Sequence, residues 1–361
     1  MKPIDRVIST LYHEEPDMVP LAEEFMTREA ERLFVGESVE REISSLKRRL
    51  LIARWWGNDI ITVGGNAPDL ISEVLVQDEK NGYVITKRAY GSIDFMREKP
   101  YFYKVLHSPV RYPEDLDRII PPDIEDFKPA VESLAREVRW FKDRGYFVES
   151  FHNGPYVMVW QFLRGLKQFL MDIVRDPEFA KKLVEFAMKP QIEVSKMIID
   201  EAKVDAIRIG GDMGTSESLM FSPKAYKEIF HPWLKRLVDE YHKRGVFVFR
   251  HCHGNINLIF EDMVNAGFDS IDPLDPHDGM DLHEIKEKYG ERITLRGGIS
   301  SHIGTYSKKQ IYKHLAEVLN IGAPGGGYIL MSAGQIPPDM PVENVLYYRE
   351  LINKIRRYHL K

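Results

Sequence analysis

The sequence predicts an α/β fold of the (β/α)8 TIM barrel type. From residue 130 onward, strand-like and helix-like segments alternate, which is typical of parallel strands joined by crossover helices. With two earlier candidates the strand-like segments number eight, enough to close a barrel. Neither a G-x-G-x-x-G after the first strand nor a G-x-x-x-x-G-K-[ST] is present, so the sequence indicates neither a dinucleotide fold nor a P-loop.

The elements follow from local patterns. The predicted strands cover residues 18–23, 59–63, 146–151, 206–212, 246–254, 268–275, 293–298 and 327–333. Helical spacing of apolar residues predicts helices at 3–12, 38–56, 157–203 and 223–244. Residues 72–106 contain β-rich runs around Asn81-Gly82, a dipeptide that favours a tight hairpin. We therefore expect one domain, residues 1–361, with an N-terminal extension and a β-hairpin insertion.

Composition narrows the class of protein. The chain has 361 residues, 43% of them hydrophobic and 29% charged, the balance of a soluble globular protein. A net charge of -5 offers no general basic field, so nucleic acid is not an expected partner. No apolar run is long enough to cross a bilayer. A single cysteine and an N-terminus without an apolar signal core predict a cytoplasmic protein.

Polar residues gather where the predicted strands end. The carboxyl ends of barrel strands form one face, where active sites lie. The candidates there are Glu23, Glu24, Asn66, Glu149, His152, Asp212, His251, His253, Asp272, Asp275, Arg296 and Ser332. Of these, we expect Glu24, Asn66, His152, Asp272 and Ser332 to bind substrate, together with Arg250 and Tyr156.

The clearest local signal is Arg250-His251-Cys252-His253. Residues two apart on a strand point to the same side, so both imidazoles are aimed together. Two histidines suit one zinc ion, and Glu149, Asp212 or His152 would supply the third ligand. The alternative is that both histidines only form hydrogen bonds within a polar pocket. Cys252, on the opposite side, is expected to be a small buried residue.

For Asp212, Glu149 and Tyr156, the sequence leaves open whether the side chain has a functional or a structural role. Asp212 follows an apolar run, where it is either a catalytic group or the cap of the next helix. Ser222-Pro223, ten residues later, is the better start for that helix, which favours the catalytic role of Asp212. Glu149 is either a catalytic group or one half of a structural ion pair. Tyr156 either donates to substrate or packs under a loop.

Several segments resemble the uroporphyrinogen decarboxylase superfamily. They are DRVISTLYHEEPDMVP, GDMGTSESLMFSPKAYKEIFHPWLKRLVDEYHKRG, FRHCHGNINLIFEDMVNAGFDSIDPLDP, DLHEIKEKYGERITLRGGIS and YILMSAGQIPPDMPVENV. The resemblance covers nearly the whole chain and implies a (β/α)8 barrel. The family contains decarboxylases, which remove carboxylates from porphyrinogens without a cofactor, and methyltransferases, which exchange methyl groups with a corrinoid protein.

The motifs favour the methyltransferase branch. The decarboxylase segment R-Q-A-G-R corresponds at best to Arg28-Glu29-Ala30-Glu31-Arg32, and its G-H-G-I block reads Ala333-Gly334-Gln335-Ile336. The branch that activates coenzyme M holds zinc with H-x-C and a distant cysteine. In His251-Cys252-His253, the first histidine matches the histidine of H-x-C, and His253 stands in place of its cysteine. The distant cysteine of that branch aligns with Gly334.

The resemblance therefore implies a methyltransferase that moves a methyl group between a small molecule and a corrinoid, or cobalamin, carried by a partner protein. The expected catalytic residues are Glu149, Asp212, His251 and His253, and the expected zinc ligands are His251, His253 and Glu149. A lyase that decarboxylates a porphyrinogen or a smaller acid, using Arg28, Arg32 and Asp212, is the first alternative. A non-catalytic binding barrel is the second. The sequence leaves open whether the chain forms a homodimer.

Overall fold

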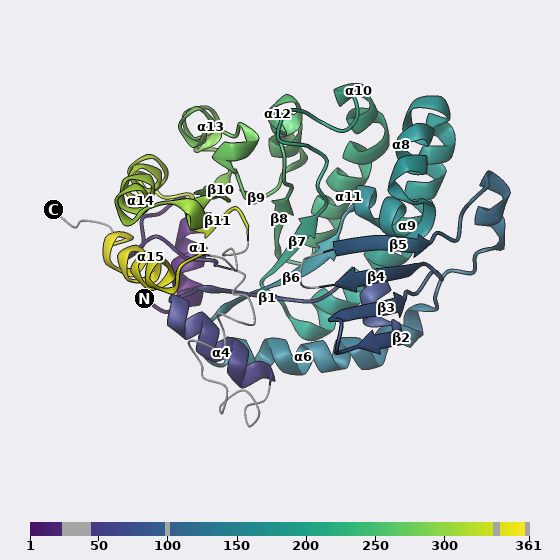
Figure 1. The fold of residues 1–361 in the computed structure, drawn as a ribbon, viewed down its shortest axis with the longest axis horizontal. Helices are drawn as coiled ribbons and strands as arrows, with labels where there is room; N and C mark the ends of the chain where they lie inside the picture. The colour runs from purple at the N-terminus through teal and green to yellow at the C-terminus, as the bar shows by residue number, and fades with distance from the viewer. Residues whose placement is uncertain (24–44, 98–101, 335–339, 358–361) are drawn as a thin grey trace.

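A parallel β-sheet of seven strands forms the centre of the computed structural model (Figure 1). The structure describes residues 1–23, 45–97, 102–334 and 340–357. Within these residues the strand order is β1-β6-β7-β8-β9-β10-β11, and every neighbouring pair is parallel. The strands are β1 (Ile60–Val63), β6 (Phe147–Asn153), β7 (Ala206–Gly210), β8 (Phe247–His251), β9 (Ser270–Asp272), β10 (Thr294–Ile299) and β11 (Tyr328–Ser332). The predicted α/β fold with parallel strands is confirmed.

Helices separate the strands along the chain and cover the outside of the curled sheet (Figure 1). The main ones are α1 (Pro3–Leu11), α4 (Ser45–Trp56), α6 (Lys128–Lys142), α8 (Leu166–Arg175), α9 (Pro177–Met197), α11 (His231–His242), α12 (Asn257–Ala266), α13 (Leu282–Tyr289), α14 (Lys308–Gly322) and α15 (Val342–Ile355). Shorter helices are α5 (Ala67–Leu70), α7 (Pro155–Val159) and α10 (Pro223–Ala225). The helix predicted over 157–203 is interrupted, because Gly165 adopts φ 80° between α7 and α8.

The segment Val19–Glu23 lies between the two outer strands of the sheet. The Ala22 N–H donates to the Leu330 carbonyl of β11 at 3.0 Å, and the Asp59 N–H next to β1 donates to the Leu21 carbonyl at 2.8 Å. A parallel bridge joins Leu21 and Leu330. The eighth predicted strand, at residues 18–23, is therefore present as a short bridging segment rather than a regular strand.

A second sheet, antiparallel and four-stranded, lies beside the parallel one (Figure 1). Its strands are β2 (Glu73–Asp78), β3 (Tyr83–Lys87), β4 (Ile93–Arg97) and β5 (Phe102–His107). β2 and β3 pair across the turn that contains Asn81 and Gly82, and Gly82 has φ 66°. Tyr103 connects this sheet to the rest of the molecule, since its ring packs edge-on against Trp160.

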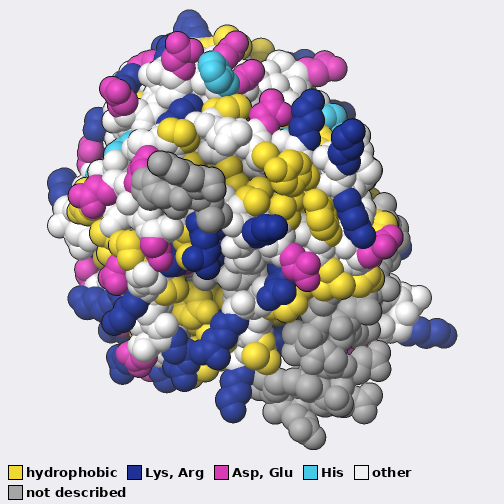
Figure 2. Space-filling model, turned by 90° about the vertical axis from the view of Figure 1, so that its left-hand side faces the viewer, with side chains coloured by type: hydrophobic (Ala, Val, Ile, Leu, Met, Phe, Trp, Pro, Cys, Tyr) yellow, Lys and Arg dark blue, Asp and Glu magenta, His cyan; other side chains and the backbone are white. Residues whose placement is uncertain are grey.

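Alternate residues of the parallel strands face two separate cores. Phe147, Ala206, Phe249 and Met331 pack with one another inside the curl of the sheet. Their sequence neighbours, such as Val148, Ile207 and Val248, pack outward against the helices. This period of two determines which side chains reach the interior. On the side of α14 and α15, hydrophobic side chains are interspersed with charged ones (Figure 2). No helix among the described residues is long and apolar enough to span a membrane.

Candidate active site

A pocket of about 590 Å³ opens among the carboxyl ends of β1, β7, β8, β10 and β11. This volume is in the range that accommodates a small-molecule ligand. The described residues that line it include Ala22, Glu23, Arg49, Ile52, Ile61, Thr62, Val63, Phe151, Arg208, His251, His253, Pro273, Arg296, Met331 and Ser332. Of the candidates at the ends of the predicted strands, Glu23, His251, His253, Arg296 and Ser332 are in this lining.

His251 is held in the pocket wall by a buried carboxylate. Its Nδ1 lies 2.6 Å from Asp272 Oδ1 and 2.9 Å from Arg208 Nη2. The Asp272 contact is the shorter, so we assign the Nδ1 proton to it, which leaves Nε2 to face a ligand. Burial acts to raise the pKa of Asp272, but the charges of Arg208 and His251 hold that pKa well below its usual range. Asp272 therefore stays ionised and orients the imidazole.

Buried ion pairs form the inner wall of the pocket. Arg208 donates from Nε to Asp272 Oδ2 at 2.9 Å and from Nη2 to Oδ1. Arg296 donates to Glu149 Oε2 at 2.8 Å, and the Thr62 hydroxyl donates to Glu149 Oε1 at 2.7 Å. Arg208 Nη1 lies 3.8 Å from the same Oε1. All four charged side chains are at most 1% exposed, so each requires its partners.

His253 and Asp212 lie at the outer edge of the site. The rings of His251 and His253 have centroids 4.9 Å apart, and the His253 N–H donates to Asp212 Oδ1 at 3.0 Å. Burial and the charge of His251 lower the pKa of His253. Burial opposes ionisation of Asp212, but the two histidines lower the pKa of its carboxyl. Asp212 is half exposed and lies 3.9 Å from His251 Nε2, beyond hydrogen-bonding distance.

The zinc ligand set expected from the sequence is not assembled. Both oxygens of Glu149 are engaged by Thr62 and Arg296, which keeps this carboxylate from a metal ion near His251 and His253. Within residues 1–23, 45–97, 102–334 and 340–357, no group of three His, Cys, Asp or Glu side chains is placed to hold a metal ion. The described residues do not fit a zinc ion.

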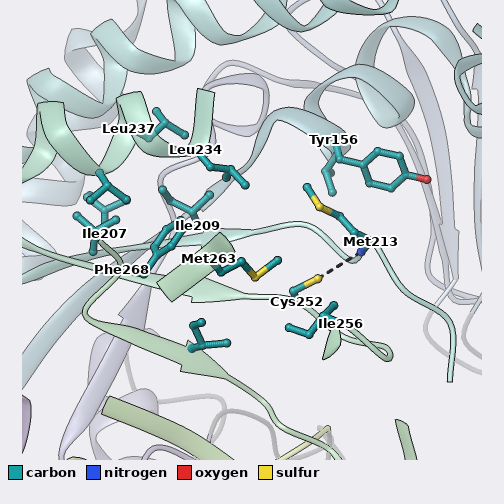
Figure 3. Packing of buried hydrophobic residues seen from close by; sticks show 14 of the residues in the cluster. Tyr156, Ile207, Ile209, Met213, Leu234, Leu237, Cys252, Ile256, Met263 and Phe268 are labelled. Carbon is teal, nitrogen blue, oxygen red and sulfur yellow. Dashed lines mark hydrogen bonds between the residues drawn. The ribbon is translucent and has the colours of Figure 1, made fainter. Parts of the chain in front are cut away.

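Cys252 packs in the outer core, as the sequence predicted. It lies among Met213, Ile256 and Met263, and its Sγ accepts a hydrogen bond from the Met213 N–H at 3.4 Å (Figure 3). Burial raises the pKa of this thiol to about 11, so it remains protonated at neutral pH.

Several expected substrate-binding residues lie outside the pocket. Arg250, on the opposite side of β8 from His251, donates to the carbonyls of Ile209 and Gly211. Tyr156 packs against Phe221 and Phe230 under the loop that carries Met220, and burial raises its pKa. The contacts of Arg250 and Tyr156 indicate structural roles.

Asn66 and His152 also form internal contacts. Asn66 accepts from the Asn153 N–H and donates to Asp69, while His152 contacts the hydroxyls of Ser150 and Ser195. Neither residue is in the lining of the pocket, and both substrate-binding assignments stay predictions. Glu24, Arg28 and Arg32 lie outside the described residues.

Arg208 and Arg49 are pocket residues that the sequence reasoning missed. Arg208 sits in the apolar run AIRIG, which reads as a fully buried strand, and Arg49 belongs to a helix before β1. The alternation of side chains along the strand could have placed Arg208 in the pocket. In a strand of period two, Arg208 faces the same way as Ala206, and the equivalent side of β8 carries Phe249 and His251.

Burial of His152 makes stability depend on pH. Because His152 is fully buried, its pKa is lowered from 6.5 to about 3, so the folded protein keeps this imidazole neutral while the unfolded chain protonates it. Stability from this group is complete above pH 6.5 and falls as the pH drops toward 3, by at most about 1.4 kcal/mol per unit. We expect urea unfolding from pH 7.5 to 5 to show a shallower decline in His152→Gln than in the parent. Equal slopes would contradict this assignment.

Comparisons with known proteins show the family and the fold of this chain. A model of the uroporphyrinogen decarboxylase (URO-D) family matches residues 93–355. The uroporphyrinogen decarboxylase of Legionella pneumophila (strain Corby) is 25% identical over 251 residues, covering 66% of this chain and 68% of that protein. That of Aliarcobacter butzleri is 25% identical over 306 residues, 79% of each chain. A methyltransferase from Methanosarcina mazei superposes with a TM-score of 0.72 at 18% identity, over 98% of this chain and 99% of that one, which shows a shared fold.

Proposed function

We propose that this chain, which belongs to the uroporphyrinogen decarboxylase family, is a methyltransferase that moves a methyl group between a small molecule and a corrinoid carried by a partner protein. We also propose that Val19–Glu23 completes a (β/α)8 barrel around the site, since its hydrogen bonds reach β11 and Asp59, the residue before β1. The observation that carries the functional proposal is the Asp272-oriented His251 in the wall of a small-molecule pocket.

His251 supplies the proton that methyl removal needs. When a methyl–oxygen bond breaks, the oxygen keeps the bonding electron pair and becomes basic. In the doubly protonated form of the ring, His251 donates its Nε2 proton to that oxygen and keeps its Nδ1 proton on Asp272, so the ring is left neutral. Arg208 keeps Asp272 ionised and in place through its two donors. In the opposite direction, Nε2 accepts the proton from the hydroxyl that receives the methyl group.

The corrinoid is expected to stay outside the pocket on its partner protein. Its cobalt would supply the acceptor for the methyl group, and the chain's own residues would hold the donor and manage the proton. A pocket of about 590 Å³ suits the small-molecule donor. We propose that the two partners meet at His253 and Asp212, because these two residues are at the outer edge of the site.

The test is methyl transfer to free cob(I)alamin under anaerobic conditions, with methyl ethers, methylamines and methyl thioethers as donors. We expect at least one donor to convert cob(I)alamin to methylcobalamin at a rate proportional to protein concentration, followed by absorbance. The same mixtures without protein are the control. Release of CO2 from a carboxylic acid without cobalamin, with no methylcobalamin from any donor, would sink the proposal in favour of a decarboxylase.

A further inference from the structure

The four-stranded sheet has an inner face that packs on the molecule and an outer face turned away from it. On the inner face, Thr86 pairs with Asp94, and these side chains are 6% and 3% exposed. Tyr103, whose hydroxyl donates to Asp94 at 3.1 Å, is on the same face. Because side chains alternate along a strand, the residues between these positions form the outer face. It carries Glu73, Val76 and Asp78 of β2, Tyr83, Ile85 and Lys87 of β3, Ile93, Phe95 and Arg97 of β4, and Phe102, Lys104 and Leu106 of β5.

The outer face exposes a continuous apolar surface. The ring of Phe95 stacks on Tyr83 with centroids 5.0 Å apart, and Phe102 packs edge-on against Phe95 at 6.0 Å. Val76, Phe102 and Leu106 are 40%, 47% and 48% exposed. The sheet lies at the side of the molecule opposite α14 and α15 (Figure 1). An exposed apolar surface with charged residues at its edges is characteristic of a protein interface.

The two edges of the outer face, β2 and β5, carry charges of opposite sign. Glu73 and Asp78 are on β2, whereas Lys104 is on β5. The pairing register places Lys104 level with Val76, so its level lies between those of the two carboxylates. Among the residues that the structure describes, neither Glu73 nor Lys104 forms an ion pair. A surface that complements this face therefore needs a cation opposite β2 and an anion opposite β5.

We infer that the outer face binds the outer face of a second copy of this chain, about a two-fold axis parallel to the strands. This axis lays β2 of each copy over β5 of the other, so Lys104 lies between the partner's Glu73 and the partner's Asp78. The aromatic rings of the two faces then pack together, as in sheets that stack with their strands within about 30° of each other. The inference does not depend on the proposed methyl transfer.

The charges also exclude the other two-fold arrangement of the same faces. An axis perpendicular to the strands would lay β2 on β2, with Glu73 against the partner's Asp78, and like charges in contact are unfavourable. The size of the face predicts a weak dimer. Strands about 4.8 Å apart, with a rise of about 3.3 Å per residue, give a face of roughly 20 by 20 Å. Such an area is at the low end of specific interfaces, so we expect dissociation in the micromolar range.

The experiment is sedimentation velocity of the full chain from about 1 to 100 µM, which brackets a micromolar dissociation constant. We expect the mass to rise from one chain to two and no further, because a two-fold interface closes. Phe102→Glu removes the most exposed ring of the described face and adds a carboxylate beside the partner's Asp78, so we expect dimerisation at least about 10-fold weaker. Tyr312→Glu, at a 53% exposed tyrosine of α14, is the matched control and should dimerise like the parent.

A charge exchange tests the orientation. Lys104→Glu places a carboxylate between two others and should weaken the dimer at least about 10-fold. Adding Glu73→Lys should recover at least about threefold of that loss. Within one chain, residues 73 and 104 are on opposite edges of the sheet, at least about 14 Å apart, which exceeds the screening length of about 8 Å at physiological salt. Recovery therefore reports a contact between two chains.

A parent that stays monomeric throughout this range overturns the inference, and so does a dimer that persists in Phe102→Glu. A monomeric parent that sediments with phosphatidylcholine vesicles, where Phe102→Glu does not, would assign the face to a lipid surface instead. Absence of recovery in the Glu73→Lys/Lys104→Glu variant overturns the two-fold arrangement. Circular dichroism checks that each variant is folded, and if Phe102→Glu is not, the two charge variants at exposed positions decide the question.

Discussion

Replacing His251 with asparagine is expected to lower kcat/KM for methyl transfer by about 10²–10⁴-fold, the usual contribution of a positioned general acid or base. The Asn amide keeps a donor near Asp272, so the buried carboxylate retains a partner and the fold is preserved. The loss follows because the amide has no group that can release a proton at the position of Nε2. Initial rates of methylcobalamin formation with the donor found in the screen, at several donor concentrations, measure the effect.

A matched control separates this loss from a general disturbance. His242→Asn removes another histidine that contacts an aspartate, since His242 Nε2 lies 2.8 Å from Asp269, but at a partly exposed position outside the pocket lining. We expect this variant to retain activity. A His251→Asn enzyme with activity within about threefold of the parent would remove His251 from the mechanism.

Replacing Glu149 with leucine is expected to lower the free energy of unfolding by about 3–5 kcal/mol. The substitution leaves Arg296 buried at 0% exposure without the carboxylate to which it donates. Arg208 also loses a charge 3.8 Å away. Urea denaturation followed by circular dichroism gives the change in free energy.

The double variant Glu149→Leu/Arg296→Met tests whether the loss comes from removing one member of the ion pair. Replacing both members of a buried ion pair with apolar groups leaves neither charge buried without the other, so we expect at least half of the lost stability to return. A double variant as unstable as the sum of the two single variants would show that the pair contributes through packing rather than charge.

The strands and their order along the chain could be predicted because each strand is a short apolar run between helical segments. Residues 206–212 and 246–254 illustrate this, since their apolar residues mark β7 and β8. The segment at 18–23 was harder, because Pro20 interrupts its few apolar residues and the pairing depends on contacts with β11 and with Asp59, just before β1. The break in the predicted helix over 157–203 depends on the backbone of Gly165.

Site residues could be predicted where two side chains share one face of a strand. They were missed where a residue's partner comes from a distant part of the sequence. His251 and His253 line the pocket as their spacing of two indicated. Arg250 and His152 were selected because they lie near the ends of predicted strands, but they stand next to the pocket residues His251 and Phe151, and adjacent residues on a strand face opposite sides. The engagement of Glu149 by Arg296 joins residues on β6 and β10, and no local pattern reveals it.

The hydrogen bonds of Val19–Glu23 have a consequence for how the chain folds. Glu23 contacts Ser332 and Tyr348, so part of the pocket wall joins residues more than 300 positions apart. Bringing such distant segments together carries a loop-closure entropy that earlier, local pairings do not. During synthesis the pocket is therefore incomplete until β11 and α15 have emerged, and the ability to bind substrate arises in the last stage of folding.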